Sequence, residues 1–486
     1  MTGQIANLHR LMPEIILSFF GILIMVIDPF VAAGKKKSMA WLSLVGAVLA
    51  LISIHFVASD PGPAYSDLIS SDMFSVFVHL VVIVSAILAI LGSMNYLEQE
   101  GLQRGEYYAL VLFATAGMGI LAGANELVTA FVGLEMSSIS TYILAGFRRH
   151  AEKSNEASLK YFLLGSFATA FFLYGVAMVY GATGTTKIDA VQAFLSAQSR
   201  TPSLAILGLG LIFVGLGFKV VAAPFQIYGP DVYEGAPTPV TALLSSAPKA
   251  ATFAVMLRIF VVAFGSTANL WFWVIFVSAV LTMFIGNLAA LVQTNVKRML
   301  AYSSIAHAGY ILVAFAASTA IGVAAVLFYL GAYVLMKVGA FLVVTHLGEK
   351  GERRLEIRDY AGLGSKQPVL AACFSLFLLS LLGLPATGGF LGKFFAFQAA
   401  LDVRDPRFTW LVVIAAINSV IGAYYYLRVI IVMYFSEPNK DYVPASVTPA
   451  LGFALAIAAI GTLYLGILPA RVLALAKTAA DSLALR

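Results

Sequence analysis

Five ionisable residues of this sequence stand inside long runs of apolar residues. They are Glu135, Lys219, Lys249, Lys337 and Lys393. A charged side chain at the centre of a lipid bilayer is costly, so it normally faces a protein interior or a water-filled path and marks an ion or proton route. Carboxyl and amino groups bind and release protons when burial and neighbouring charges change. The five residues together therefore predict a row of proton-carrying stations on several helices.

The composition places these residues in a membrane protein. Of the 486 residues, 60% are hydrophobic and 11% are charged, and the mean hydropathy is +0.92. A soluble protein of this size carries more charge on its surface. The net charge of +6 is modest and is expected in loops beside the membrane, not on a nucleic-acid-binding surface. The expected fold is all-α and polytopic.

Cofactor binding is not expected on this chain. Its single cysteine, Cys373, excludes an internal disulfide bond and any metal or iron–sulfur site with several thiolate ligands from the chain. The sequence has no P-loop and no glycine-rich dinucleotide motif in a suitable context. We therefore predict that the chain acts through side chains, backbone and water.

Apolar segments of about 20 residues are long enough to cross a bilayer as helices, and the sequence predicts about 14 of them. The expected spans are 11–32, 39–58, 73–95, 107–123, 125–147, 156–183, 203–246, 248–266, 270–292, 299–317, 320–346, 368–401, 408–435 and 448–469.

The distribution of lysine and arginine between the spans predicts the orientation. One set of loops holds sixteen of these residues, whereas the opposite set, which includes both termini, holds eight. Because positively charged loops stay on the cytoplasmic side, both termini are expected on the outer, periplasmic side.

Two of the expected spans, 203–246 and 368–401, contain helix-breaking residues next to a lysine. Lys219 is followed by Pro224, and the glycine-rich stretch 383–389 precedes Lys393. Proline removes a helical hydrogen bond, and backbone freed at membrane depth is tolerated only against protein or water. A lysine beside such a break is typical of an ion site in a discontinuous helix.

The broken helices also indicate an internal repeat. Three pairs of residues recur at offsets of 174, 172 and 170: Lys219 with Lys393, Glu135 with His307, and Arg258 with Arg428. Each copy would contain five spans, and an odd number makes the second copy enter the membrane from the opposite face. The expected organisation is an N-terminal three-helix segment (1–106), two inverted five-helix repeats (107–267 and 268–436), and a C-terminal helix and tail (437–486).

Several motifs resemble one known family. The run 224–241, PFQIYGPDVYEGAPTPVT, looks like the broken-helix motif of the antiporter-like membrane subunits of respiratory complex I, the NADH:quinone oxidoreductase. The stretches 133–135, 303–309 and 389–393 also match, and VYEGAPTPVTA followed by Pro248 and Lys249 is most similar to the N-type subunit, the equivalent of mitochondrial subunit 2. Gln226 and Tyr228 depart from the His and Trp that are more usual in the family, which makes a titratable group at 226 doubtful.

The resemblance implies a proton-translocating subunit in a bacterial inner membrane. Flavin (FMN), iron–sulfur clusters and quinone would lie on partner subunits, and this chain would contact a neighbouring antiporter-like subunit, small membrane subunits and lipid. Two alternatives remain at this stage. One is a subunit of a multisubunit cation/proton antiporter, and the other is a non-pumping membrane scaffold.

Glu135 and Lys219 are expected to form an ion pair whose opening and closing changes the proton affinity of the lysine. The alternative is a static salt bridge. Lys249 follows Pro248 and is expected to pass protons between two half-paths, the alternative being a helix-end lysine that reaches to the interface. Lys393 is the expected terminal station of the second repeat.

His307 and Lys337 are the expected connecting relays. The alternative for His307 is a hydrogen bond to a backbone carbonyl without titration. Arg258 and Arg428 keep their charge at any useful pH, so they are expected to hold contacts or to bias the lysines electrostatically.

Overall fold

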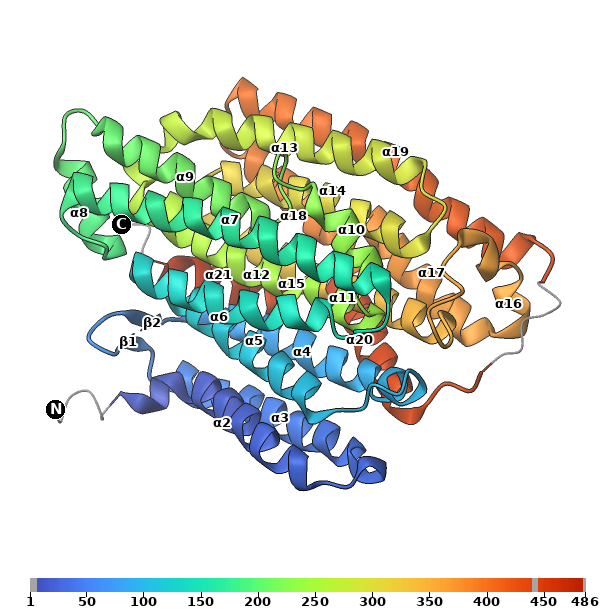
Figure 1. The fold of residues 1–486 in the computed structure, drawn as a ribbon. Helices are drawn as coiled ribbons and strands as arrows, with labels where there is room; N and C mark the ends of the chain where they lie inside the picture. The colour runs from blue at the N-terminus through green and yellow to red at the C-terminus, as the bar shows by residue number, and fades with distance from the viewer. Residues whose placement is uncertain (1–6, 439–444, 484–486) are drawn as a thin grey trace.

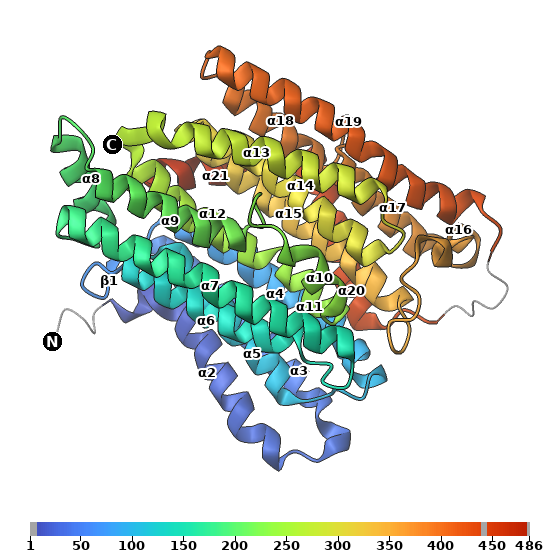
Figure 2. The same ribbon diagram turned by 45° about the horizontal axis from the view of Figure 1, so that its top comes forward.

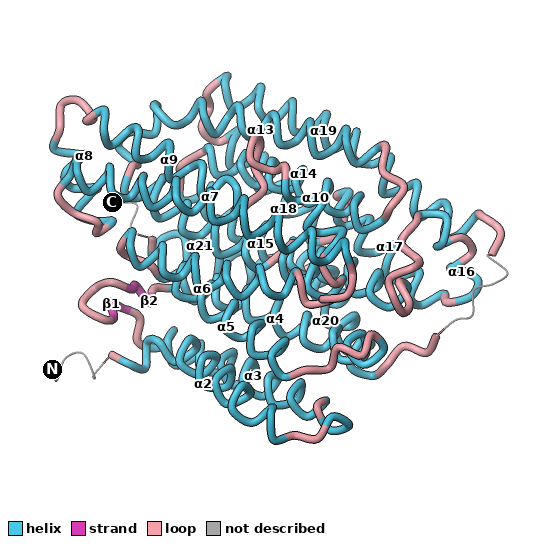
Figure 3. The backbone as a smooth tube through the Cα atoms, viewed as in Figure 1, coloured by secondary structure: helices cyan, strands magenta, loops and turns pink. Residues whose placement is uncertain are grey.

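The helices of this protein lie nearly side by side in one elongated bundle, as Figures 1 and 2 show. The structure is a computed structural model, and it describes residues 7–438 and 445–483. Figure 3 shows that helix makes up most of the described chain and that the loops gather at the two ends of the bundle. The small hairpin of β1 (Gly62–Ala64) and β2 (Ile69–Ser71) lies at one end with helix α8, and α16 lies at the other.

The expected all-α membrane fold is confirmed. In the described residues, twelve helical stretches are long and apolar enough to cross a membrane. The first half contains α2 (Met12–Ile27), α3 (Lys37–Ser59), α4 (Met73–Gln99), α5 (Gly105–Gly123), α6 (Leu127–Ala145), α7 (Glu152–Thr183), α8 (Ile188–Ala197), α9 (Ser203–Lys219), α10 (Tyr228–Gly235), α11 (Thr238–Leu244) and α12 (Ala247–Met256). The second half contains α13 (Ala268–Leu291), α14 (Val296–Ala316), α15 (Ala320–Leu347), α16 (Leu363–Lys366), α17 (Pro368–Leu382), α18 (Gly388–Leu401), α19 (Pro406–Phe435), α20 (Pro449–Ile467) and α21 (Ala470–Ser482).

Short helical pieces complete the chain. The 3₁₀ segments are η1 (Leu8–Leu11), η2 (Asp28–Phe30), η3 (Ala33–Lys35), η5 (Gly265–Thr267) and η6 (Ile357–Tyr360), and η4 (Leu257–Ala263) is a π-helical continuation of α12. The interrupted elements α9 with α10 and α17 with α18 occupy the positions of the two expected broken spans.

One expected boundary is wrong. Residues 238–244 were expected at the end of the broken span 203–246, but they form α11 and open the next span, Thr238–Ala263. Ala236 and Pro237 have extended backbone and end α10, while Pro239 sits in the first turn of α11. Proline is tolerated there because the first N–H groups of a helix have no helical partner. The same proline-rich run therefore ends one helix and starts the next.

Burial separates central helices from rim helices. The spans formed by α11–α12–η4, α14 and α15 are 100%, 94% and 89% buried in their most apolar windows, whereas α19 and α20 are each 33% buried. The rim helices expose large apolar side chains such as Trp410 and Val420. Such faces suit lipid or neighbouring membrane subunits. The three central helices carry Lys249, His307 and Lys337.

Candidate proton-translocation site

The two interrupted helices position Lys219 and Lys393 beside helix ends. Lys219 is the last residue of α9. Lys393 lies in the second turn of α18, and its Nζ donates to the carbonyl of Leu382, the last residue of α17, over 2.8 Å. The C-terminal end of a helix carries partial negative charge, so it stabilises a nearby ammonium group. Both lysines thus lie where a discontinuous helix favours a cation.

Lys219 contacts aromatic groups instead of the expected carboxylate. Its Nζ donates to the Tyr142 hydroxyl over 3.0 Å, and it lies 4.7 Å and 5.2 Å from the ring centres of Tyr142 and Tyr161. Among the described residues no ion pair joins Lys219 to Glu135, and the buried Oε1 of Glu135 has no hydrogen-bond partner. The expected direct pair is therefore not formed. Tyr142 lies two turns after Glu135 on α6 and takes the contact with Lys219.

Lys249 lies deep in the bundle, which contradicts the alternative of a helix-end lysine. It stands 11 residues after the start of the 26-residue span Thr238–Ala263 and is 1% exposed. Its Nζ donates to the carbonyl oxygen and the hydroxyl of Ser304, over 2.5 Å and 2.6 Å. The Ser304 hydroxyl in turn lies 2.6 Å from that of Tyr333.

Lys337 lies on α15, another of the three central helices, and also contacts α14. It is fully buried, and its Nζ donates to the Leu300 carbonyl over 2.6 Å and to the Ser303 hydroxyl over 3.0 Å. Lys249 and Lys337 therefore hold adjacent serines of α14. No carboxylate pairs with either lysine in the described part of the chain. A buried cation without a counter-charge destabilises the folded protein, so stabilisation of the fold does not explain why lysine stands at these two positions.

His307 extends the hydrogen-bonded path from Lys337. The Ser303 hydroxyl lies 2.5 Å from the Tyr426 hydroxyl, which lies 3.2 Å from His307 Nε2. The other ring nitrogen, Nδ1, lies 2.8 Å from the Tyr329 hydroxyl. The side-chain partners of His307 are thus two phenols, which can donate or accept a hydrogen bond.

Lys393 is the last of these ionisable residues along the chain. We call these residues the polar row: Glu135, Lys219, Lys249, Lys337, His307 and Lys393. The Nζ of Lys393 contacts the Ser419 hydroxyl at 2.8 Å and lies 4.7 Å from the ring centre of Tyr310. Over the described residues, direct hydrogen bonds link Lys337 to His307 through Ser303 and Tyr426. They leave gaps between Glu135 and Lys219, between Lys219 and Lys249, between Lys249 and Lys337, and between His307 and Lys393. Proton movement across those gaps would need bridging water.

Sequence reasoning missed the hydroxyl groups that connect the row. Ser303 and Ser304 lie in a motif noted for its histidine, and tyrosines are common packing residues of apolar helices. One signal was present for Tyr142, because it follows Glu135 by seven residues and so shares its helix face. Tyr329, Tyr333 and Tyr426 come from helices whose neighbours in space were unknown.

A second buried charge cluster lies at the end of the bundle that carries α16. Glu352, whose side chain is 6% exposed, pairs with Lys297 at 2.9 Å and with Arg148 at 3.3 Å. It also accepts hydrogen bonds from the backbone N–H and hydroxyl of Thr238, at 2.7 Å and 2.6 Å, and so caps the start of α11. Tyr96 adds a hydrogen bond from α4. One loop carboxylate therefore ties several helices to the beginning of the span that carries Lys249.

The charges around Glu352 set its ionisation. Burial alone raises the pKa of this carboxyl group, but Lys297, Thr238 and Arg148 outweigh burial and hold the pKa below its ordinary value of 4.5. The ionised form is therefore bound more tightly in the folded protein than in the unfolded chain. Its stabilising contribution is present above pH 4.5 and is lost as the pH falls through the lower pKa of the folded state.

Replacing Glu352 by glutamine is expected to destabilise the fold by about 3–5 kcal/mol, because it leaves Lys297 buried without its counter-charge. The matched control is Glu349→Gln in the same loop, whose side chain is 45% exposed and which should cost within about 0.5 kcal/mol. Thermal unfolding of the detergent-solubilised protein between pH 3.5 and 7 (roughly the window set by linkage) measures both. The wild type should lose stability below pH 4.5, with a weaker acid dependence for Glu352→Gln. Equal unfolding temperatures for the two variants would contradict the capping role.

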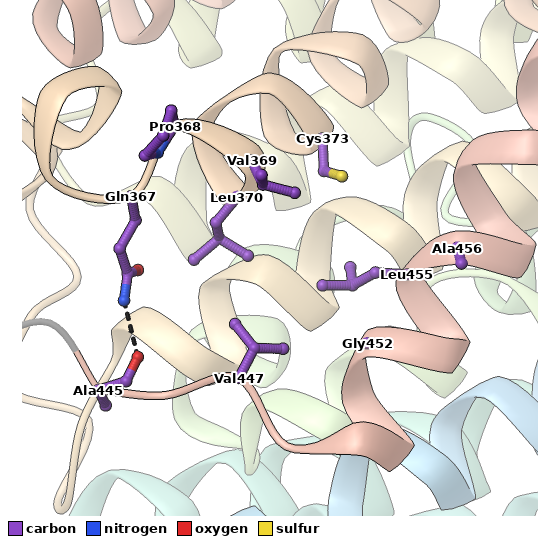
Figure 4. A pocket seen from close by; sticks show the side chains of 10 residues that line it. All are labelled: Gln367, Pro368, Val369, Leu370, Cys373, Ala445, Val447, Gly452, Leu455 and Ala456. Atoms are coloured by element: carbon purple, nitrogen blue, oxygen red, sulfur yellow. Dashed lines mark hydrogen bonds between the residues drawn. The ribbon is translucent and has the colours of Figure 1, made fainter.

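A groove elsewhere on the molecule does not belong to the polar row. It has a volume of about 400 Å³ and lies between the start of α17 and α20 (Figure 4). Its lining is mainly apolar, and the Gln367 amide is already bonded to the Ala445 carbonyl at 2.7 Å. Cys373 borders this groove and is partly exposed.

The geometry defines a class of protein. A bundle of membrane-spanning helices with two interrupted helices and a row of buried lysines is the arrangement of an ion-translocating membrane subunit. Residues 124–422 match the family described as "NADH:quinone oxidoreductase/Mrp antiporter, TM". The chain belongs to this family.

Two relatives of nearly the same length are similar to this chain in sequence. The chain is 49% identical to NADH-quinone oxidoreductase subunit N 1 of Solibacter usitatus, over 98% of this chain and 97% of the relative. It is 45% identical to subunit N of Trichlorobacter lovleyi over the same shares of the two chains.

Solved structures give the same architecture. A chain of respiratory complex I from Thermus thermophilus with bound aureothin matches with a TM-score of 0.80 and 35% identity, over 95% of this chain and 99% of that chain. A chain of the Mrp complex from Dietzia matches with a TM-score of 0.81 over 98% and 97%, but at 22% identity this likeness concerns the fold alone.

Proposed function

We propose that this chain is the N-type proton-translocating subunit in the membrane arm of a bacterial NADH:quinone oxidoreductase. The polar row is the observation that carries the proposal, because several buried lysines with neutral partners have no evident structural purpose. Near-full-length relatives that are 45–49% identical are named as subunit N of that enzyme. The match to a chain of the Mrp complex, at 22% identity, concerns the fold alone.

In this proposal the redox chemistry belongs to partner subunits. FMN, iron–sulfur clusters and quinone bind there, and the chain contributes a proton path that responds to electrostatic or conformational change. In the described residues there is no group of three or more His, Cys, Asp or Glu side chains that could hold a metal ion. The partners of this chain are the neighbouring antiporter-like subunit, small membrane subunits and lipid.

Each member of the polar row has an assigned role. Glu135 sets the charge around Lys219, and Lys219 loads the proton. Lys249 and Lys337 pass it across the centre through the adjacent serines of α14, and His307 relays it. Lys393 is the terminal station. The hydrogen bonds of Lys249 to Ser304 and of Lys337 to Ser303 support these two roles, because proton transfer requires groups within hydrogen-bond reach. Transfer between the two lysines would need a bridging water.

The two halves of the row fit a pair of inverted repeats, 107–267 and 268–436, flanked by segments 1–106 and 437–486. Lys219 and Lys393 each lie at a helix interruption, and Arg258 and Arg428 each approach the C-terminal end of another helix. These likenesses support the repeat.

The oxidoreductase assignment is tested by affinity purification of the tagged chain from mildly solubilised membranes. The expected result is co-purification with an assembly that oxidises NADH and contains iron–sulfur clusters. Recovery with antiporter subunits alone, without NADH oxidation, would move the assignment to the cation/proton antiporters. Recovery of a complex whose proton pumping is unaffected by every lysine variant of the row would favour the scaffold alternative.

Both termini are proposed to face the periplasm of the inner membrane, as the loop charges indicate. A cysteine introduced as Lys350→Cys in a Cys373→Ser background lies in an exposed part of the 348–356 loop. It should react with an impermeant maleimide only after the cytoplasmic face is opened. A matched outer-face cysteine, Arg200→Cys, should react in intact spheroplasts. The reverse labelling pattern would contradict the orientation.

A further inference from the structure

Two arginines, the buried Arg258 and the partly buried Arg428, approach helix ends in similar ways. Arg258 Nε donates to the Ala122 carbonyl, one residue before the end of α5, over 2.8 Å. Arg428 Nη1 donates to the carbonyls of Leu291, the last residue of α13, and Gln293, over 3.4 Å and 3.2 Å. The last carbonyls of a helix lack helical partners and carry partial negative charge, so a guanidinium stabilises them.

The two arginines differ in their acidic partner. Arg258 Nη2 also binds both carboxylate oxygens of Asp72, at 2.7 Å and 2.9 Å. Within residues 7–438 and 445–483, Arg428 bonds backbone carbonyls and no carboxylate. A guanidinium has five N–H donors, and its charge-assisted bonds to an anion are the strong ones. Arg428 therefore lacks the anion that its counterpart has.

The free side of Arg428 borders a cavity of about 550 Å³. A second arginine, Arg358, lines the same cavity, together with Thr294, Ile357, Val432 and Ser436. Glu356 is also in the lining, but its carboxylate accepts the backbone N–H of Asp359 in the capping box of η6. Two guanidinium groups beside one engaged carboxylate leave the cavity with net positive charge.

The cavity lies beside the last turns of α19, the part of a long membrane helix that approaches the lipid headgroups. Helix α19 has 30 residues and is about 45 Å long, whereas the hydrocarbon core of a bilayer is about 30 Å thick. Arg428 is seven residues before the end of α19, about 10 Å from it, and the remaining lining residues belong to loops or the end of that helix. On the outer face of α19, Leu427, Ile431 and Phe435 are exposed. An anion in this cavity would thus adjoin an apolar face that acyl chains can cover.

We propose that the cavity between Arg358 and Arg428 binds the phosphate of an anionic phospholipid, which takes the place that Asp72 holds beside Arg258. Arginine binds phosphate through two parallel hydrogen bonds, and phosphate oxygens accept from several donors at once. Free phosphate shares this chemistry but leaves the apolar face of α19 uncovered, so the lipid is the favoured source.

The test uses the assembled complex in liposomes that contain a trace of phosphatidylglycerol with a photoreactive group near its headgroup. After illumination, labelled peptides are mapped by mass spectrometry. The expected adducts lie on 357–361 and 428–436, and the matching phosphatidylcholine probe should label these peptides less. Arg428→Gln and Arg358→Ala should each lower this labelling about fivefold, since one basic residue near an anionic membrane surface contributes about 1 kcal/mol. Arg353→Ala, an exposed arginine of the same loop, is the matched control and should leave it unchanged.

Arg358→Ala keeps the experiment decisive if Arg428→Gln disturbs the end of α13, because in the described structure the hydrogen bonds to the Leu291 and Gln293 carbonyls come from Arg428 and not from the side chain of Arg358. Equal labelling by the two lipids would overturn the proposal. Loss of labelling on addition of millimolar inorganic phosphate would assign the cavity to the free anion and overturn the lipid assignment. Cross-linking of the cavity to a carboxylate-bearing neighbouring subunit, without lipid adducts, would also overturn it.

Discussion

Lys219→Ala is expected to lower NADH-driven quinone reduction and the coupled proton uptake by about tenfold or more, which corresponds to about 1.4 kcal/mol in the rate-limiting barrier. Alanine removes the amine that loads the proton. Lys219→Arg keeps the positive charge but cannot release a proton, since guanidinium has a pKa above about 12. Arginine should therefore impair coupled turnover too. The measurement uses reconstituted vesicles, with assembly checked on native gels.

Two further variants test the residues near Lys219 in the same experiment. Glu135→Gln should impair turnover, and the double variant with Lys219→Ala should be no worse than the worse single variant, because coupled groups are non-additive. Tyr142→Phe removes the hydroxyl that accepts from Lys219 and should have a smaller effect. A fully assembled Lys219→Arg enzyme that pumps at the wild-type rate would leave only a structural role for this lysine.

Lys337→Ala is expected to reduce proton pumping strongly, with a much smaller loss for Lys337→His. Alanine interrupts the hydrogen-bonded path to Ser303, whereas imidazole can still bind and release a proton near neutral pH. The vesicle assay should be run beside a packing control. Val338→Ala, at the neighbouring fully buried position, changes core volume without changing the path. Equal pumping by the alanine and histidine variants, both near wild type, would reduce Lys337 to a packing residue.

The membrane class, the two interruptions and the buried lysines could all be predicted from the sequence. Each depends on local information, because apolar length, proline and glycine act within a few residues of their position. The division of the proline-rich run 236–239 between two helices could not be predicted. Proline breaks a helix interior but also favours the first helical turn, so the sequence was compatible with both readings.

The residues that contact each ionisable side chain depend on tertiary structure, so they were harder to predict from the sequence. The ion pair of Glu135 with Lys219 was a reasonable expectation from charge, but Tyr142 occupies the contact. Lys297 falls between the expected spans 270–292 and 299–317, which predicts a loop cation, but it is fully buried against Glu352, which lies 55 residues away. A loop carboxylate that ends up buried has no distinctive local pattern, so only the packed chain reveals it.

The most direct test of the account is the number of protons translocated per NADH oxidised by a complex that carries Lys249→Met. Methionine fills much of the same space without a titratable group, and Lys249 has a central place in the polar row, at 1% exposure. If protons pass through Lys249, an assembled variant complex should translocate fewer protons per NADH, or turn over about tenfold more slowly with the ratio kept. An assembled Lys249→Met complex with the wild-type ratio at the wild-type rate would contradict a proton path through this chain.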